Sequence, residues 1–156
     1  MGLVDTIVAS TLVRAAETAE HIAAAIGVGP VLLEPALIER DAGEWSGLTK
    51  VEIERRWPGY LDSGDRPPGY EPEGPFRARV FDALEAIAVA SGTGDVLVVT
   101  HGGVIYAVES VLGASWRRIP NLGGRWLELD ENGNRTLGDR VDLVTEEGSI
   151  TVPDQL

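Results

Sequence analysis

Short apolar runs alternate along this chain with longer, often alanine-rich stretches. Short apolar runs bounded by turn residues are typical of buried strands, and they occur at 5–9, 31–34 and 95–100. Helices are predicted at 12–26, 49–57, 75–91 and 104–112. Two further runs, at 125–129 and 135–143, flank Asn132-Gly133, a dipeptide that favours an antiparallel hairpin.

This order of elements predicts the α/β class. We expect a three-layer α/β/α fold with a mostly parallel sheet, helices on both faces and a C-terminal hairpin. Several helix ends carry local signals. Ser10 and Thr11 supply hydroxyls suited to capping, Thr49 and Glu52 match a capping box, and Pro75 suits the first position of its helix.

Two connecting segments lack a regular pattern. Residues 38–48 combine glycines, charges and Trp45, which indicates a loop. Residues 59–74 are rich in proline, glycine and acids, which favours an exposed excursion or lid. Trp45 and Trp126 are expected in the core.

The composition limits the kinds of partner and site that this chain can have. The 156 residues are in the range of one domain, 1–156, and are enough to bury a core. The net charge of −12 argues against nucleic acid or an anionic membrane as the partner, but it leaves room for a small phosphorylated substrate held by a few local cations. No cysteine is present, which excludes disulfides and thiolate metal sites and fits a cytoplasmic location. No apolar run is long enough to cross a bilayer, and the start lacks a signal-peptide pattern.

The candidate chemistry lies where predicted strands end. His101 follows a buried strand directly, and ligands of open α/β sheets bind beyond the carboxyl ends of strands. Arg14 falls in the first turn of a helix, where backbone N–H groups and an arginine fork together suit an oxyanion. The alternative for Arg14 is a solvated residue that pairs with Glu17 or Thr18.

Three acids in one loop are candidates for a general acid: Glu39, Asp41 and Glu44. Their spacing does not choose among them, and each is equally compatible with a solvated loop charge. His21, the second histidine, is predicted to be a surface or boundary residue. With two histidines and no cluster around them, a histidine-based metal site is not expected.

Three segments together carry a resemblance to a known family. Residues 10–19 (STLVRAAETA), 37–48 (LIERDAGEWSGL) and 98–105 (VVTHGGVI) resemble, in order and spacing, three conserved blocks of the histidine phosphatase superfamily, in its phosphoglycerate mutase-like branch. The resemblance implies that Arg14 binds phosphate, that Glu39 donates a proton to the leaving oxygen and that His101 stabilises the transferring phosphoryl group. Gly102 would lie beside them in the substrate site, and neither a metal nor an organic cofactor is expected.

The sequence departs from the family at its nucleophile. The family's attacking histidine stands in an Arg-His-Gly block at the end of the first strand, and these 156 residues contain no Arg-His-Gly. We therefore expect the first βα unit of the family to be missing. Two explanations are open: a start assigned too late, or a remnant without turnover, and an in-frame Arg-His-Gly upstream of Met1 would discriminate between them.

The resemblance implies a phosphomonoester hydrolase that acts through a phosphohistidine, the nucleophile segment being absent from this chain. Two alternatives stay open: a phosphoglycerate mutase-type phosphotransferase, and a non-catalytic phosphate-binding or protein-interaction module. The short segment 59–74 favours the hydrolase over the mutase. The missing strand would lie beside 96–100, so we expect marginal stability or a homo-oligomer formed through the exposed strand.

Overall fold

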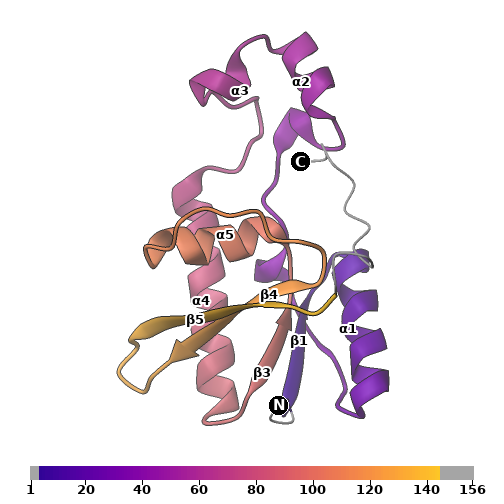
Figure 1. The fold of residues 1–156 in the computed structure, drawn as a ribbon, viewed down its shortest axis with the longest axis vertical. Helices are drawn as coiled ribbons and strands as arrows, with labels where there is room; N and C mark the ends of the chain where they lie inside the picture. Colours follow the sequence, from indigo (N-terminus) through magenta and orange to yellow (C-terminus); the bar gives the residue numbers. More distant parts are fainter. Residues whose placement is uncertain (1–3, 145–156) are drawn as a thin grey trace.

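A three-stranded parallel sheet lies at the centre of the computed structural model, which describes residues 4–144. Strand β1 (Thr6–Ser10) pairs with β2 (Leu32–Glu34) on one edge and with β3 (Val96–Val99) on the other. Both pairings are parallel, so the carboxyl ends of the three strands point the same way (Figure 1). The residues that follow β1 and β3 are therefore neighbours in space.

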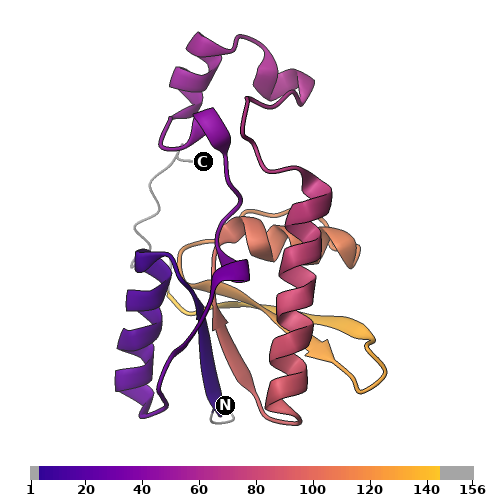
Figure 2. The same cartoon turned by 180° about the vertical axis from the view of Figure 1, so that it is seen from behind.

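The sheet is covered on both faces, which confirms the three-layer prediction. Helix α1 (Val13–Ile26) lies on one face, and α4 (Glu73–Ser91) and α5 (Gly102–Val111) lie on the other (Figures 1 and 2). Because successive side chains of a strand point to opposite faces, Ile7 and Ala9 pack with Ala19 of α1. Val8 belongs to the second cluster, which contains Phe76 of α4. One short strand thus serves two cores.

Helix ends follow the local signals in part. Helix α2 (Lys50–Arg56) begins with the predicted capping box, in which Thr49 and Glu52 satisfy each other's backbone N–H groups. Two predictions were wrong. No side chain caps α1: its N-cap is Leu12, and the Ser10 hydroxyl accepts the N–H of Leu12 itself rather than one from the first turn of the helix. Helix α4 begins at Glu73, two residues before Pro75, because Pro72 supplies its extended N-cap.

The predicted hairpin is present but forms a sheet of its own. Strands β4 (Gly123–Leu129) and β5 (Arg135–Asp142) pair antiparallel, and Leu127 and Leu137 pack against the core under α4 and α5. Trp126 is 52% exposed, so the expectation that it lies in the core was wrong. It is the neighbour of the inward-facing Leu127 on a strand, and it points outward for that reason.

Residues between β2 and α4 extend beyond the carboxyl ends of the strands (Figure 1). They contain two short 3-10 helices, Pro35–Leu37 and Gly43–Trp45, then α2 and the one-turn helix α3 (Tyr60–Ser63). Trp45 is 3% exposed, as expected, and its ring meets those of Trp57 and Tyr70 edge to face at 6.4 and 6.0 Å. The segment between β2 and α4, called the excursion from here on, is largely exposed, but it contains a small cluster of aromatic side chains.

Strand β3 offers an edge for association with another chain. Within residues 4–144, β3 pairs with β1 alone and β4 pairs with β5 alone. An apolar strand with unpaired N–H and C=O groups is a template for pairing. We expect the chain to self-associate through this edge, with a thermal midpoint that rises with protein concentration. Analytical ultracentrifugation checks this, and a monomer that unfolds cooperatively well above about 60 °C would contradict it.

In the part of the chain that the structure describes, no helix combines the length and apolar character needed to cross a membrane.

Candidate active site

A buried histidine and a buried serine meet at the carboxyl ends of β1 and β3. Ser10 is the last residue of β1 and is fully buried, and His101 is 7% exposed at the N-cap of α5. The Nε2 atom of His101 lies 2.8 Å from the Ser10 hydroxyl, which also accepts the N–H of Leu12 at 3.2 Å. The serine therefore fixes the imidazole ring. Sequence reasoning treated Ser10 as a helix cap and missed this role, although a polar residue at a buried strand's end was the available signal.

Glu39 reaches the same place from a different segment. The hydroxyl of Thr100 donates to the carbonyl of Leu37 at 2.7 Å and so ties the loop to the end of β3. The Oε2 atom of Glu39 then accepts the N–H of Gly103 at 3.0 Å, and its Oε1 atom accepts the N–H of Arg40 at 2.8 Å. The carboxyl group is thus oriented at the first turn of α5, two residues from His101.

Of the two glycines that begin α5, Gly103 has a steric reason to be glycine. A Cβ atom on Gly103 would overlap the carboxyl group of Glu39, so only glycine leaves room for that contact. Gly102 was the glycine assigned to the substrate site from the sequence. It is the first residue of α5, where the backbone N–H has no acceptor within the helix. The structure thus gives Gly103 a role in holding Glu39 that the sequence did not reveal.

Arg14 lies exposed in the first turn of α1, just past the end of β1. Among the described residues its guanidinium has neither a hydrogen-bond nor an ion-pair partner, and Thr18 bonds only to its backbone carbonyl. The alternative pairing of Arg14 with Glu17 or Thr18 side chains is therefore not seen. A cation at this helix end is unfavourable in itself and is stabilised by an anion.

The two other acids of the Glu39 loop lie elsewhere. Asp41 and Glu44 are exposed, and Asp41 accepts the N–H of Gly43 in a local turn. Of the three acids that the spacing left open, Glu39 is the one next to His101. His21 is exposed on α1, as predicted.

The surroundings of His101 favour its neutral form. Burial lowers the pKa of His101 below its ordinary value near 6.5, and the positive charge of Arg14 lowers it further, while the Glu39 carboxylate raises it. With a neutral imidazole, the cation that acts on His101 without an ion-pair partner of its own in the described residues is Arg14. Arg14 can therefore bind an anion without first breaking an ion pair.

This pKa predicts a pH dependence of stability. Unfolded His101 binds a proton near pH 6.5, whereas the folded protein does so only at lower pH, so the unfolded state holds more protons between these values. The stability is fully present above about pH 6.5 and falls as the pH is lowered toward the folded pKa. Thermal unfolding from about pH 7.5 to 5.5 checks this. His101→Gln should flatten the profile and His21→Gln should keep it; a flat profile in the unaltered protein would contradict the prediction.

Across residues 4–144, no group of three or more histidine, aspartate or glutamate side chains is arranged to hold a metal ion.

Comparison with known proteins assigns the family. The chain belongs to the histidine phosphatase superfamily (branch 1), whose family model matches residues 3–138.

Two relatives illustrate the range within that family. A 2,3-bisphosphoglycerate-dependent phosphoglycerate mutase of Methylobacterium radiotolerans is 35% identical over 136 residues, which are 76% of this chain and 61% of the mutase. A bifunctional protein of Mycobacterium tuberculosis is 35% identical over 107 residues, or 64% of this chain and 29% of that protein. The chain thus matches less than two thirds of the length of either relative.

Solved structures share the fold. A mycobacterial glucosyl-3-phosphoglycerate phosphatase in its native form is similar with a TM-score of 0.59 and 31% identity, over 69% of this chain and 56% of that one. The same enzyme in complex with VO3 gives a TM-score of 0.72 at 26% identity, over 85% of this chain and 74% of that one. A Bacillus stearothermophilus protein, YhfR, shares the fold with a TM-score of 0.75 at 24% identity, over 86% of this chain and 72% of that one.

Proposed function

We propose that the site at the carboxyl ends of β1 and β3 binds the phosphoryl group of a small phosphorylated substrate, and that the activity is phosphomonoester hydrolysis of the histidine phosphatase type. One observation carries the proposal. Arg14, Glu39 and His101 are far apart in the sequence but close in the fold, and the guanidinium of Arg14 has no partner within the described residues. Phosphoryl transfer depends on this kind of positioning and charge neutralisation.

Each residue has a distinct role in the proposal. The guanidinium of Arg14 binds two phosphoryl oxygens as a fork. His101, held by Ser10, stabilises the charge on the transferring group. In the proposal the N–H of Gly102, which has no acceptor within α5, donates to an oxygen of the same group. Glu39 gives a proton to the leaving oxygen, so that the alcohol departs neutral. No metal or organic cofactor takes part.

The covalent step needs a nucleophile that these residues do not supply. In the proposed scheme a histidine nitrogen attacks phosphorus, the bond to the leaving oxygen breaks, and water then releases phosphate from the phosphohistidine. His21 does not serve, because it lies exposed in the middle of α1. Hydrolysis therefore requires an Arg-His-Gly segment, which the 156-residue sequence does not contain.

A mutase activity is the second candidate, and one observation favours it: the 35% identity with a phosphoglycerate mutase. Against it stands the small excursion, in which the only helix between α2 and α4 is the one-turn α3. We rank hydrolysis first on the small size of this segment. We also propose a cytoplasmic location, in keeping with the lack of cysteine.

Two assays on two forms of the protein test the proposal. The 156-residue chain should bind inorganic phosphate without turning over a nitrophenyl phosphate. The same chain extended at its N-terminus by a βα segment with Arg-His-Gly should release phosphate from that ester. Isomerisation of phosphoglycerate without net phosphate release would favour the mutase, and phosphate binding with no turnover in the extended protein would favour the non-catalytic module.

A further inference from the structure

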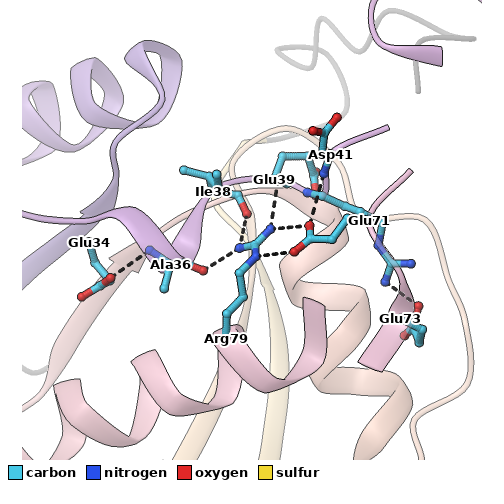
Figure 3. A network of polar contacts seen from close by, with 9 residues as sticks. Glu34, Ala36, Ile38, Glu39, Asp41, Glu71, Glu73 and Arg79 are labelled. Atoms are coloured by element: carbon cyan, nitrogen blue, oxygen red, sulfur yellow. Dashed lines mark hydrogen bonds and ion pairs between the residues drawn. The ribbon is translucent and has the colours of Figure 1, made fainter. Parts of the chain in front are cut away.

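One arginine outside the catalytic set holds the loop that carries Glu39. Arg79 of α4 uses every N–H of its guanidinium, which has five. Its Nη atoms donate to the carbonyl oxygens of Ala36, Ile38 and Glu39 at 2.6, 2.9 and 3.2 Å. Its remaining N–H groups donate to both carboxylate oxygens of Glu71 at 2.7 and 2.8 Å (Figure 3).

The guanidinium itself is fixed from two sides. Its carbon atom lies 4.7 Å from the ring centre of Phe76, which is fully buried in the core. The bidentate bond from Arg79 also lowers the pKa of Glu71, so this carboxylate stays charged. The guanidinium of Arg79 is therefore held in one orientation between the core and the loop, and it is not a free surface charge.

Glu71 extends the arrangement to the excursion. Its backbone N–H donates to the carbonyl of Asp41 at 2.8 Å, and its Oε2 atom accepts the N–H of Asp41 at 3.3 Å. The chain entering the excursion and the chain leaving it are thus joined at Glu71, and Glu71 is joined to Arg79 (Figure 3). Arg79 thus holds the residues before Glu39 directly, and it is linked to Asp41, on the other side, through Glu71.

We propose that Arg79 is a positioning residue for the acid Glu39: through three backbone carbonyls it sets where the Glu39 carboxyl meets the N–H of Gly103 beside His101. The inference deepens the proposed function and rests on it for the role of Glu39. Arg79 bonds to the backbone of Glu39 and not to its carboxyl group, so it acts by placement. A displacement of about 1 Å at a reacting group lowers rates by about a hundredfold, which makes such placement matter.

The amide of Gly103 is a direct reporter of this placement. Amides in the first turn of a helix lack an intrahelical acceptor, so protection of Gly103 from hydrogen exchange depends on the Glu39 carboxyl. We would record amide spectra and exchange rates of the free protein for Arg79→Lys, which keeps the charge and loses the planar fork. The expected result is exchange at Gly103 about tenfold or more faster, while Ala19, in the opposite core, keeps its protection.

Two further variants decide the interpretation. Arg77→Ala removes an arginine of the same helix that is bonded to Glu73 and Ser110, and it should leave Gly103 unchanged. Glu39→Gln should raise the exchange rate of the Gly103 amide, as Arg79→Lys does. An unchanged exchange rate of Gly103 in Arg79→Lys would overturn the proposal. An equal increase in Arg77→Ala, or a loss of protection at Ala19 in Arg79→Lys, would overturn it too. None of these readings needs phosphate, so failure of phosphate binding would reject the proposed function alone.

Discussion

Arg14→Ala is expected to lower the affinity for inorganic phosphate by about 10- to 100-fold. The guanidinium has no partner within residues 4–144 and stands at the positive end of α1. A charge-assisted hydrogen bond contributes about 1.5–3 kcal/mol, and a fork makes two of them, partly offset by loss of water. Isothermal titration calorimetry on the 156-residue chain measures the change.

The variant separates binding from stability. Removing a cation from the first turn of a helix relieves an unfavourable interaction of a few tenths of a kcal/mol, so Arg14→Ala should fold at least as well as the original protein. Arg14→Lys keeps the charge without the fork and should bind phosphate with intermediate affinity. Arg77→Ala removes the same charge from an exposed site and serves as the control. If Arg14→Ala and Arg77→Ala bind alike, phosphate binds elsewhere.

Much of the fold was readable from the sequence because its signals are local. The capping box at Thr49 and Glu52 and the turn at Asn132-Gly133 each act within a few residues. The side chains of β1 are buried on both faces of the sheet, and their alternation between the two faces depends only on the two-residue period of a strand. These features do not depend on contacts with distant parts of the chain.

The site was predictable only as a set of candidates. From the residues alone, Glu39, Asp41 and Glu44 were equivalent, and it was the resemblance that singled out Glu39. In the structure the difference comes from the contact of Glu39 with Gly103, 64 positions away. Spacing along a loop carries no information about such a partner.

Two other residues were missed for the same reason. Ser10 has a local use as a cap, and this use hid its contact with His101, 91 positions away. Arg79 carries no motif at all, since its acceptors are backbone carbonyls on a distant loop. The same limit explains Trp126, whose size suggested burial although its register on β4 points it outward.

Glu109→Leu is expected to destabilise the fold by about 3 kcal/mol, or about 6–12 °C in the unfolding midpoint. Glu109 on α5 is 3% exposed and receives bonds of 2.8 and 2.6 Å from Arg140 of β5, which is 8% exposed. Arg125 lies 3.8 Å from the same carboxylate, and its buried Nε atom has no hydrogen-bond partner in residues 4–144. Without Glu109 both arginines lose their counter-charge.

A second pair between a helix and β5 provides the matched control. Glu85 of α4 pairs with Arg135, but these side chains are 46% and 28% exposed. Water screens such a pair, so Glu85→Gln should cost no more than about 1 kcal/mol. Urea unfolding of the two variants compares a buried and an exposed pair in one protein. Equal losses would mean that burial of Glu109 carries no extra energy.

The double variant Glu109→Leu, Arg140→Met separates two sources of the destabilisation. One is the loss of the Glu109–Arg140 ion pair, and the other is the charge of Arg140 left buried without a carboxylate. If the pair itself supplied the stability, the double variant would be as unstable as the single one. Most of the cost instead comes from leaving Arg140 buried without a carboxylate, so replacing both partners by apolar groups should restore part of the stability. Full restoration is not expected, because Arg125 stays uncompensated and the carbonyls of Arg117 and Arg118 lose the donors that Arg140 supplies. A double variant less stable than Glu109→Leu alone would contradict this account.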